Sequence, residues 1–208
     1  MKPAIRPQKQ DVPALILASG SMARRQILTG AGVPFGVDPA DIDEEALKQD
    51  LLAKGQTPRV IAQALAQAKA IARSSQTPGL VIGADQTLDL DGILFNKAAT
   101  MAEAEASLRQ LRGKTHQLHS ATVLARDGEP VWQEVVTASL TMREFSDQFL
   151  AAYLQDQGPA ILSCVGGYQL EAQGVQLFEQ IEGDYFTILG LPLSGLLAQL
   201  RLYGVLDE

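Results

Sequence analysis

Cysteine, histidine and aromatic residues are scarce in this sequence, and each shortage excludes a class of site. The single cysteine, Cys164, cannot close a disulfide within the chain, and no histidine pattern accompanies it as a thiol nucleophile would need. His116 and His119 lie three positions apart on a predicted strand, so their side chains point to opposite faces of the sheet and cannot share a metal ion. Aromatic residues, at 5%, are too few to indicate stacking platforms for single-stranded nucleic acids.

Basic residues are also too few for a nucleic-acid-binding surface. The chain has 17 lysines and arginines against 24 aspartates and glutamates, which gives a formal net charge of −7. Proteins that follow a nucleic-acid backbone need a broad basic face. We therefore expect no nucleic-acid partner, whereas a small anion held by a few residues in one pocket is allowed.

No hydrophobic run is long enough to cross a membrane. The longest uncharged apolar stretch near the end, Tyr185–Leu200, is interrupted by glycine and proline and falls short of the roughly 20 residues that a span needs. The apolar run Ala14–Ala18 is shorter than the core of a signal peptide. We therefore expect no membrane partner and a cytoplasmic location, which a single cysteine also fits.

The remaining composition is that of a globular protein, with 46% hydrophobic and 20% charged residues. Residues 1–13 carry three prolines and mixed charge without periodicity, so we interpret them as a flexible leader. Residues 14–208 should then form one domain. Strand–helix units mixed with hairpins indicate an α/β fold, with a mixed twisted central sheet, helices on both faces and two lobes that flank a nucleotide-sized cleft.

Periodicity and turn residues predict the elements of this domain. Asp91-Gly92 and Asp127-Gly128 are typical of tight hairpin turns, and Thr57-Pro58 opens the clearest helix. The stripe that this helix should bury is Ile61, Leu65, Ala68 and Ala72. Strands are expected at 14–18, 34–37, 80–83, 87–90, 93–95, 115–125, 131–142, 175–179 and 185–189, and near Tyr168. The other helices are expected at 22–29, 100–112, 146–155 and 192–203.

A short turn between the first strand and the first helix is a candidate anion site. Ser19-Gly20-Ser21 leads into the helix, and Arg24 and Arg25 lie in its first turn. Cations are unfavourable beside the partial positive charge of a helix N-terminus unless an anion joins them. Free N–H groups, hydroxyls and guanidinium forks together would hold a phosphate. The alternative is that one arginine points to solvent or pairs with an acid elsewhere.

Asp85 is the second candidate. It follows the apolar strand 80–83 within Gly83-Ala84-Asp85-Gln86. A carboxylate at the end of a buried strand suits a magnesium ligand or a base that deprotonates water. An aspartate that only forms a turn fits the same pattern.

Two lysines complete the set of candidates. Lys69 lies at the flank of the expected helical stripe, and Lys97 lies in a loop after the strand 93–95. Each lysine is either a solvated surface residue or a ligand that reaches into a cleft.

Five ordered segments of the chain resemble motifs of the Maf family of nucleoside triphosphate pyrophosphatases. They lie at the separations found in that family and cover nearly the whole chain after residue 13. The segments are Leu17-Ala18-Ser19-Gly20-Ser21-Met22-Ala23-Arg24-Arg25, Ala64-Leu65-Ala66-Gln67-Ala68-Lys69-Ala70, Gly83-Ala84-Asp85-Gln86, Leu111-Arg112-Gly113-Lys114-Thr115-His116, and Glu182-Gly183-Asp184-Tyr185 with Gly190-Leu191-Pro192-Leu193.

This resemblance implies a cytosolic, homodimeric enzyme that cleaves a nucleoside triphosphate between the α and β phosphates. The products would be a monophosphate and pyrophosphate, and the implied cofactor is Mg²⁺ or Mn²⁺. By position, Asp85 becomes the residue that activates water and lies near the metal, and Glu44 becomes a second acidic residue at the metal. The implied triphosphate ligands are Ser19, Ser21, Arg24, Arg25, Lys69 and Lys97.

Within the family, the chain is more similar to the 7-methyl-GTP pyrophosphatases than to the dTTP and UTP pyrophosphatases. The second branch carries Asp-Thr where this chain has Asp85-Gln86. The implied specificity residues are Ala23, where the first branch often has tryptophan, Gln86 and Glu171. A carboxylate at Glu171 could accept hydrogen bonds from N1–H and the amine of guanine. A dTTP or UTP pyrophosphatase and a non-catalytic nucleotide-binding regulator of cell division are the alternatives.

Overall fold

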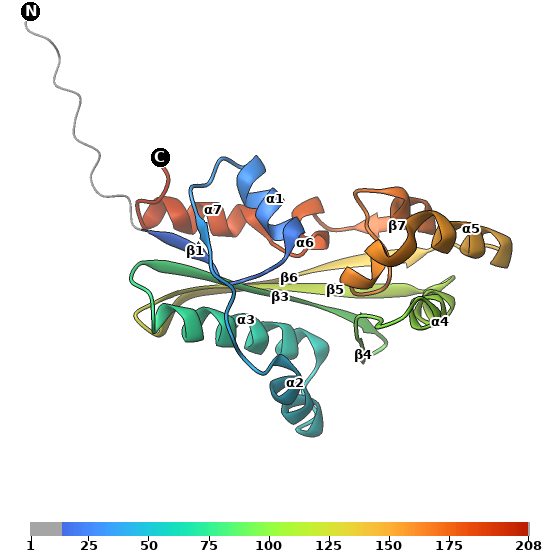
Figure 1. The fold of residues 1–208 in the computed structure, drawn as a ribbon, viewed down its shortest axis with the longest axis horizontal. Helices are drawn as coiled ribbons and strands as arrows, with labels where there is room; N and C mark the ends of the chain where they lie inside the picture. The colour runs from blue at the N-terminus through green and yellow to red at the C-terminus, as the bar shows by residue number, and fades with distance from the viewer. Residues whose placement is uncertain (1–13, 208) are drawn as a thin grey trace, which may run out of the picture.

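The computed structural model describes residues 14–207 and shows a seven-stranded sheet of order β2-β1-β3-β5-β6-β7, with β4 paired to β3 (Figure 1). The expected leader, residues 1–13, lies outside the described residues. β1 pairs in parallel with β2 and β3, and the other pairs are antiparallel, so the sheet is mixed. The strands are β1 (Leu15–Leu17), β2 (Gly36–Val37), β3 (Leu80–Leu90), β4 (Ile93–Phe95), β5 (Thr115–Arg126), β6 (Glu129–Met142) and β7 (Phe178–Glu182).

Most helices begin at a side chain that caps their first free N–H groups. Each cap accepts the N–H of the third helical residue; these caps are Ser21, Asp43, Thr57, Thr100, Ser146 and Asp184. The helices are α1 (Met22–Gly30), α2 (Glu44–Ala53), α3 (Pro58–Ser74), α4 (Met101–Leu111), α5 (Asp147–Gln157), α6 (Tyr185–Ile188) and α7 (Leu193–Leu202), with the 3₁₀ turns η1 (Gly158–Ser163) and η2 (Gln173–Leu177). None of the helices in the described part of the chain combines the length and apolarity that crossing a membrane requires.

Helices cover both faces of the sheet, with α3 on one face and α1, α6 and α7 on the other (Figure 1). α3 packs small alanines, such as Ala66, against β5. On the opposite face, one apolar cluster joins β1, β3, α1 and α7 and includes Ile82, and a second joins β3 to α4 and α5 and includes Leu88. Even-numbered β3 residues share a face, so both clusters lie on one side of the sheet. The predicted α/β class, with a mixed sheet and helices on both faces, is confirmed.

Both predicted hairpin turns are confirmed. Asp91 and Gly92 have φ angles of 54° and 83°, and Asp127 and Gly128 have 53° and 82°. A two-residue turn of this kind needs positive φ at both positions, which Asp-Gly tolerates well. The turns set the registers of β3 with β4 and of β5 with β6.

Three predictions in the last third of the chain are wrong. The expected strand 185–189 is the short helix α6, because Asp184 caps it through the N–H of Thr187 and the chain turns at Gly190, whose φ is 94°. No strand forms at Tyr168, which lies in a turn region. The strand expected at 175–179 is β7 at Phe178–Glu182, since the 3₁₀ turn η2 occupies the residues before it.

The helices before the site also differ from expectation. Helix α2 was not predicted, although Asp43 caps it and Glu44 and Glu45 occupy its first turn, a favourable pattern for a helix N-terminus. In α3, Ala68 and Ala72 are only half-buried. The buried residues of α3 are Pro58, Ile61, Ala62, Leu65, Ala66, Lys69, Ala70 and Ser74. Lys69 therefore lies inside the buried stripe and not at its flank.

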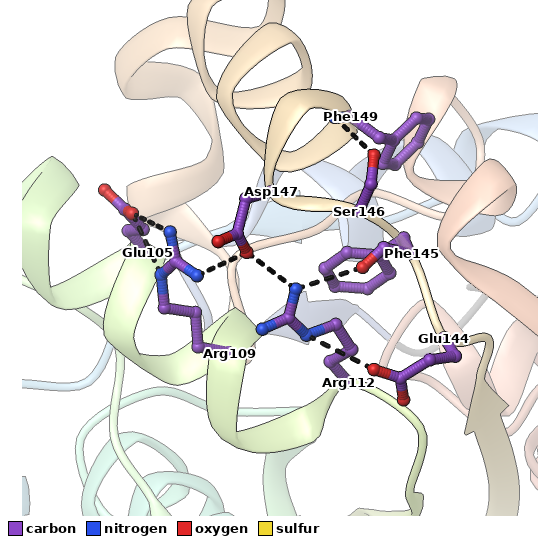
Figure 2. A network of polar contacts seen from close by, with 8 residues as sticks. All are labelled: Glu105, Arg109, Arg112, Glu144, Phe145, Ser146, Asp147 and Phe149. Carbon is purple, nitrogen blue, oxygen red and sulfur yellow. Dashed lines mark hydrogen bonds and ion pairs between the residues drawn. The ribbon is translucent and has the colours of Figure 1, made fainter.

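A polar network joins α4 to the start of α5 (Figure 2). Asp147 Oδ1 accepts from Arg109 Nη1 at 2.6 Å and from Arg112 Nη1 at 2.7 Å. Arg112 Nη1 also donates to the carbonyl oxygen of Phe145, and Arg109 pairs with Glu105. Hydrogen bonds from Arg112 and Arg109 hold the pKa of the Asp147 carboxyl below its usual value. Because these groups are at the surface, the network orients the two helices more than it stabilises them.

Candidate active site

The candidate site lies where one edge of β3 has no neighbouring strand. β1 pairs with Leu80–Ile82 and β4 pairs with Leu88–Leu90, so residues 83–87 are open on that edge. On the other edge, β5 pairs with β3 from Val81 to Asp89. This continuous pairing joins the two strands that we expected at 80–83 and 87–90 into the single strand β3. Asp85 is therefore a mid-strand residue, and the prediction that it follows a strand or forms a turn is wrong.

Lys69 lies between two carboxylates at this open stretch. Its Nζ is 2.6 Å from Asp85 Oδ1 and 2.7 Å from Glu44 Oε2. The side chains of Lys69 and Asp85 are 9% and 12% exposed, whereas that of Glu44 is 51% exposed. α3 supplies the lysine, β3 the buried carboxylate and the first turn of α2 the exposed one. The Lys69 ammonium is thus bound by Asp85 on its buried side and by Glu44 on its solvent-exposed side.

A glycine allows α3 to lie close enough to β3 for this ion pair. A Cβ at Gly83 would be 2.1 Å from the carbonyl oxygen of Ala66, which is far inside contact distance. Next along the same strand face, Thr87 Oγ1 donates to the carbonyl oxygen of Pro58 at 2.9 Å. Gly83, Asp85 and Thr87 alternate along β3 and so face α3 together. The spacing of helix and strand therefore fixes where Asp85 meets Lys69.

Arg24 joins three segments of the chain behind the site. Its Nε donates to the carbonyl oxygen of Gly190 at 2.9 Å, and its Nη1 donates to Ser19 Oγ and to the carbonyl oxygen of Ala84, both at 2.9 Å. Burial lowers the pKa of the Arg24 guanidinium, while the charges of Asp85 and Glu44 act to raise it. The anionic surroundings and the carbonyl oxygens keep a buried cation satisfied.

The turn before α1 has the arrangement that the sequence predicted. Ser21 caps the helix by accepting the N–H of Arg24, and the Ser21 N–H lies 3.3 Å from Ser19 Oγ. Arg25 is half-buried, and its Nε is buried without a hydrogen-bond partner among residues 14–207. Ala23 is half-buried in the first turn of the helix. The Nε of Arg25 is thus a donor that this part of the protein leaves without an acceptor.

The structure brings some of the predicted site residues together and leaves others apart. Arg24 contacts Ser19, Lys69 contacts both Asp85 and Glu44, and Arg24 also binds the carbonyl oxygen of Ala84, next to Asp85. Lys97 and Glu171 are exposed, and neither forms a hydrogen bond or ion pair with this group in the described part of the chain. The amide of Gln86 faces away from Asp85, towards the end of α6.

The sequence did not predict the groups that bind Gln86 and Arg24. Gln86 binds Ser120 on β5 and the carbonyl oxygens of Thr187 and Ile188. Arg24 binds the carbonyl oxygen of Gly190. The Gly190-Leu191-Pro192-Leu193 motif was the one available signal for this segment. Carbonyl oxygens have no side-chain pattern, so their roles emerge only from the fold.

The two carboxylates fit a divalent ion that arrives with its substrate. No three histidine, cysteine, aspartate or glutamate side chains gather as a ready-made metal site within residues 14–207. Asp85 and Glu44 nevertheless converge on one cation, the ammonium of Lys69. Mg²⁺ commonly takes one or two protein carboxylates and completes its octahedron with substrate phosphates and water. With the nearby arginines, this donor set can hold a polyphosphate and a divalent ion.

Comparison with known proteins agrees with this geometry. The family model of Maf-like proteins matches residues 14–203. A protein of Caulobacter vibrioides named nucleoside triphosphate pyrophosphatase is 58% identical over 190 residues, which cover 91% of this chain and 96% of the relative. A protein of Brucella abortus named 7-methyl-GTP pyrophosphatase is 50% identical over 194 residues, which cover 93% and 98% of the two chains. The chain described here belongs to the Maf family.

Proposed function

We propose that this protein is a metal-dependent nucleoside triphosphate pyrophosphatase. The names of its relatives support a hydrolase that acts on acid anhydrides. One observation in the structure carries the proposal: a buried carboxylate, Asp85, and a solvent-facing one, Glu44, converge on Lys69, and the guanidinium of Arg24 binds the carbonyl oxygen of Ala84, the residue before Asp85. A site of this kind offers both the base and the positive charges that cleavage of a phosphoanhydride requires.

In this mechanism, Asp85 accepts a proton from the water that attacks the α-phosphorus. The new P–O bond forms as the bond to the bridging oxygen breaks, and pyrophosphate leaves with the bonding electrons. Lys69, Arg25 and the Arg24 Nη2 group, which has no hydrogen bond within residues 14–207, neutralise the charge that develops on the phosphates. Asp85 and Glu44 would hold a divalent ion, which would supply further charge neutralisation on the phosphate oxygens.

The preferred base in this proposal is a modified guanine, as in 7-methyl-GTP. Several relatives of about 50% identity bear that name. Glu171, exposed and on a loop, is the proposed acceptor for the Watson–Crick edge of guanine. Ala23, where that branch of the family often has tryptophan, offers less stacking surface for a cationic base. Lys97, also exposed, is the proposed ligand of the outer phosphates.

The test is a panel of standard and modified triphosphates incubated with Mg²⁺ or Mn²⁺ and the purified protein. We expect pyrophosphate as product and the highest kcat/KM for 7-methyl-GTP. Asp85→Asn should lower kcat at least about 100-fold, whereas Asp127→Asn, which keeps a turn-forming residue in a distant hairpin, should leave kcat unchanged. Release of orthophosphate, or full activity of Asp85→Asn, would contradict the proposal. A preference for dTTP or UTP would overturn the base assignment alone, and tight binding without turnover would indicate a nucleotide-binding regulator.

A further inference from the structure

The residues on either side of Asp85 are tied to one turn of the C-terminal segment. Side chains alternate along a strand, so Ala84 and Gln86 lie on the face opposite to Asp85. On that face the end of α6 and the residues after it lie against Gln86, with Thr187, Ile188 and Leu191 buried. We call residues 187–190 the α6–α7 turn. It is the segment whose carbonyl oxygens Gln86 and Arg24 bind.

Gln86 holds this turn from the strand side. Its Nε2 lies 3.0 Å from the carbonyl oxygens of both Thr187 and Ile188, and 2.8 Å from Ser120 Oγ. Ser120 Oγ in turn donates to the carbonyl oxygen of Thr187 at 2.7 Å. The donor end of the Gln86 amide is therefore used within the protein. These contacts form a polar seam on the face that also carries the two apolar clusters.

Arg24 holds the same turn from the other side of Asp85. Its Nε binds the carbonyl oxygen of Gly190, and its Nη1 binds the carbonyl oxygen of Ala84 on the open edge of β3. One guanidinium thus connects the end of the turn directly to the residue before Asp85. A Cβ at Gly190 would lie 3.6 Å from both Arg24 and Gln86 Oε1, so the two side chains converge at this position.

We propose that Gln86 and Arg24 are positioning residues that clamp the α6–α7 turn onto β3 and thereby fix the backbone on both sides of Asp85. This inference rests on the proposed role of Asp85 as the base. It gives Gln86 a task other than reading the base, which the family resemblance implies for it. A catalytic group that shifts by about 1 Å loses roughly 100-fold in rate, so the clamp should act on turnover and not on the choice of base.

Gln86→Thr separates the two roles, because threonine is the residue of the pyrimidine-specific branch and cannot span to the turn. With a purine and a pyrimidine triphosphate as substrates, we expect kcat to fall between about 10- and 100-fold by the same factor for both, with KM nearly unchanged. A changed ratio of kcat/KM between the two bases would show that Gln86 reads the base, and would overturn the inference. Gln133→Thr, on the exposed part of β6, is the matched control and should leave both values unchanged.

Ser120→Ala and hydrogen exchange keep the inference testable if Gln86→Thr folds poorly or turnover is absent. Ser120→Ala removes one bond to Thr187 and should lower kcat by a smaller, equally base-independent factor. The amides of Gly190, in the turn, and of Leu191, directly after it, should exchange at least about 10-fold faster in Gln86→Thr than in the wild type. In Ser120→Ala the same amides should exchange faster by a smaller factor. Unchanged exchange in both variants would refute the clamp whether or not the protein hydrolyses triphosphates. A lower Tm with unchanged kcat of the folded enzyme would show a merely structural role, and would also contradict it.

Discussion

Lys69 Nζ and Asp85 Oδ1 form a buried ion pair of 2.6 Å that bridges α3 and the middle of β3. A charge removed from water is costly unless it is paired, so each of these residues depends on the other. Glu44 adds a second, more exposed carboxylate to the same ammonium. The pair therefore contributes to the fold as well as to the proposed chemistry, and the two contributions can be measured apart.

Replacement of Lys69 by methionine should destabilise the protein by about 3 kcal/mol, because it leaves the buried Asp85 carboxylate without its partner. Urea unfolding at neutral pH measures this change. In the double variant Lys69→Met/Asp85→Asn, most of the loss should be recovered, since the unpaired charge is then gone. Lys54→Met breaks the exposed pair with Asp50 and should cost less than about 1 kcal/mol. Equal losses of unfolding free energy in Lys69→Met and Lys54→Met would show that the buried pair stabilises the fold no more than the exposed pair does.

Gly83→Ala should lower both the stability of the protein and its turnover. Its new methyl group would meet the carbonyl oxygen of Ala66 at 2.1 Å, and α3 can give way only by moving Lys69 from Asp85. We expect a loss of about 3 kcal/mol in unfolding free energy, together with reduced turnover of the folded fraction. Gly30→Ala at the end of α1, where a methyl group meets nothing within 4 Å, should be neutral or slightly stabilising. A Gly83→Ala protein as stable as Gly30→Ala would contradict the close packing.

His116 should make stability fall as the pH is lowered. It is 1% exposed, its Nε2 shares a 2.7 Å hydrogen bond with the Tyr168 hydroxyl, and burial lowers its pKa from 6.5 to about 4. Between these two pKa values the unfolded chain binds a proton that the folded protein excludes, so stability is full above pH 6.5 and declines towards pH 4. From pH 7.5 to pH 5 this histidine should account for a loss of about 2 kcal/mol.

The measurement for His116 is urea unfolding at both pH values in the wild type and in His116→Gln. Other groups titrate in both proteins, so the difference between their pH dependences isolates the imidazole. The wild type should lose more stability than the variant. Parallel losses would mean that His116 titrates normally in the folded state.

Local patterns in the sequence predicted the parts of the fold that local chemistry decides. Asp91-Gly92 and Asp127-Gly128 form the expected hairpin turns, and α3 begins at Pro58 with Thr57 as its cap. The strand expected at 185–189 is the helix α6, because a run of apolar residues is compatible with either state and the Asp184 cap decided between them. β3 was expected as two strands, 80–83 and 87–90, and it is one strand because its pairing with β5, a contact between distant residues, continues through the residues between them.

As with the fold, local sequence patterns predicted some features of the candidate site, and tertiary contacts decided the others. Ser21 as a cap and two arginines in the first turn of α1 follow from spacing, and the structure confirms that placement. Lys69 and Asp85 were both candidates, but their direct pairing depends on the close approach of α3 at Gly83. The engagement of Arg24 and Gln86 with carbonyl oxygens of the α6–α7 turn has no counterpart in sequence pattern. Tertiary contacts thus distinguish positioning residues from residues that are free to bind a ligand.

Hydrolysis in water enriched with ¹⁸O shows which phosphorus the site attacks. With 7-methyl-GTP, Mg²⁺ and the wild-type protein, attack at the α-phosphorus directed by Asp85 places the label in the nucleoside monophosphate and leaves the pyrophosphate unlabelled. Mass spectrometry of the two products reads this directly, and Asp85→Asn should form neither at a measurable rate. Label in the pyrophosphate would contradict attack at the α-phosphorus directed by Asp85, and labelled orthophosphate would contradict cleavage between the α and β phosphates.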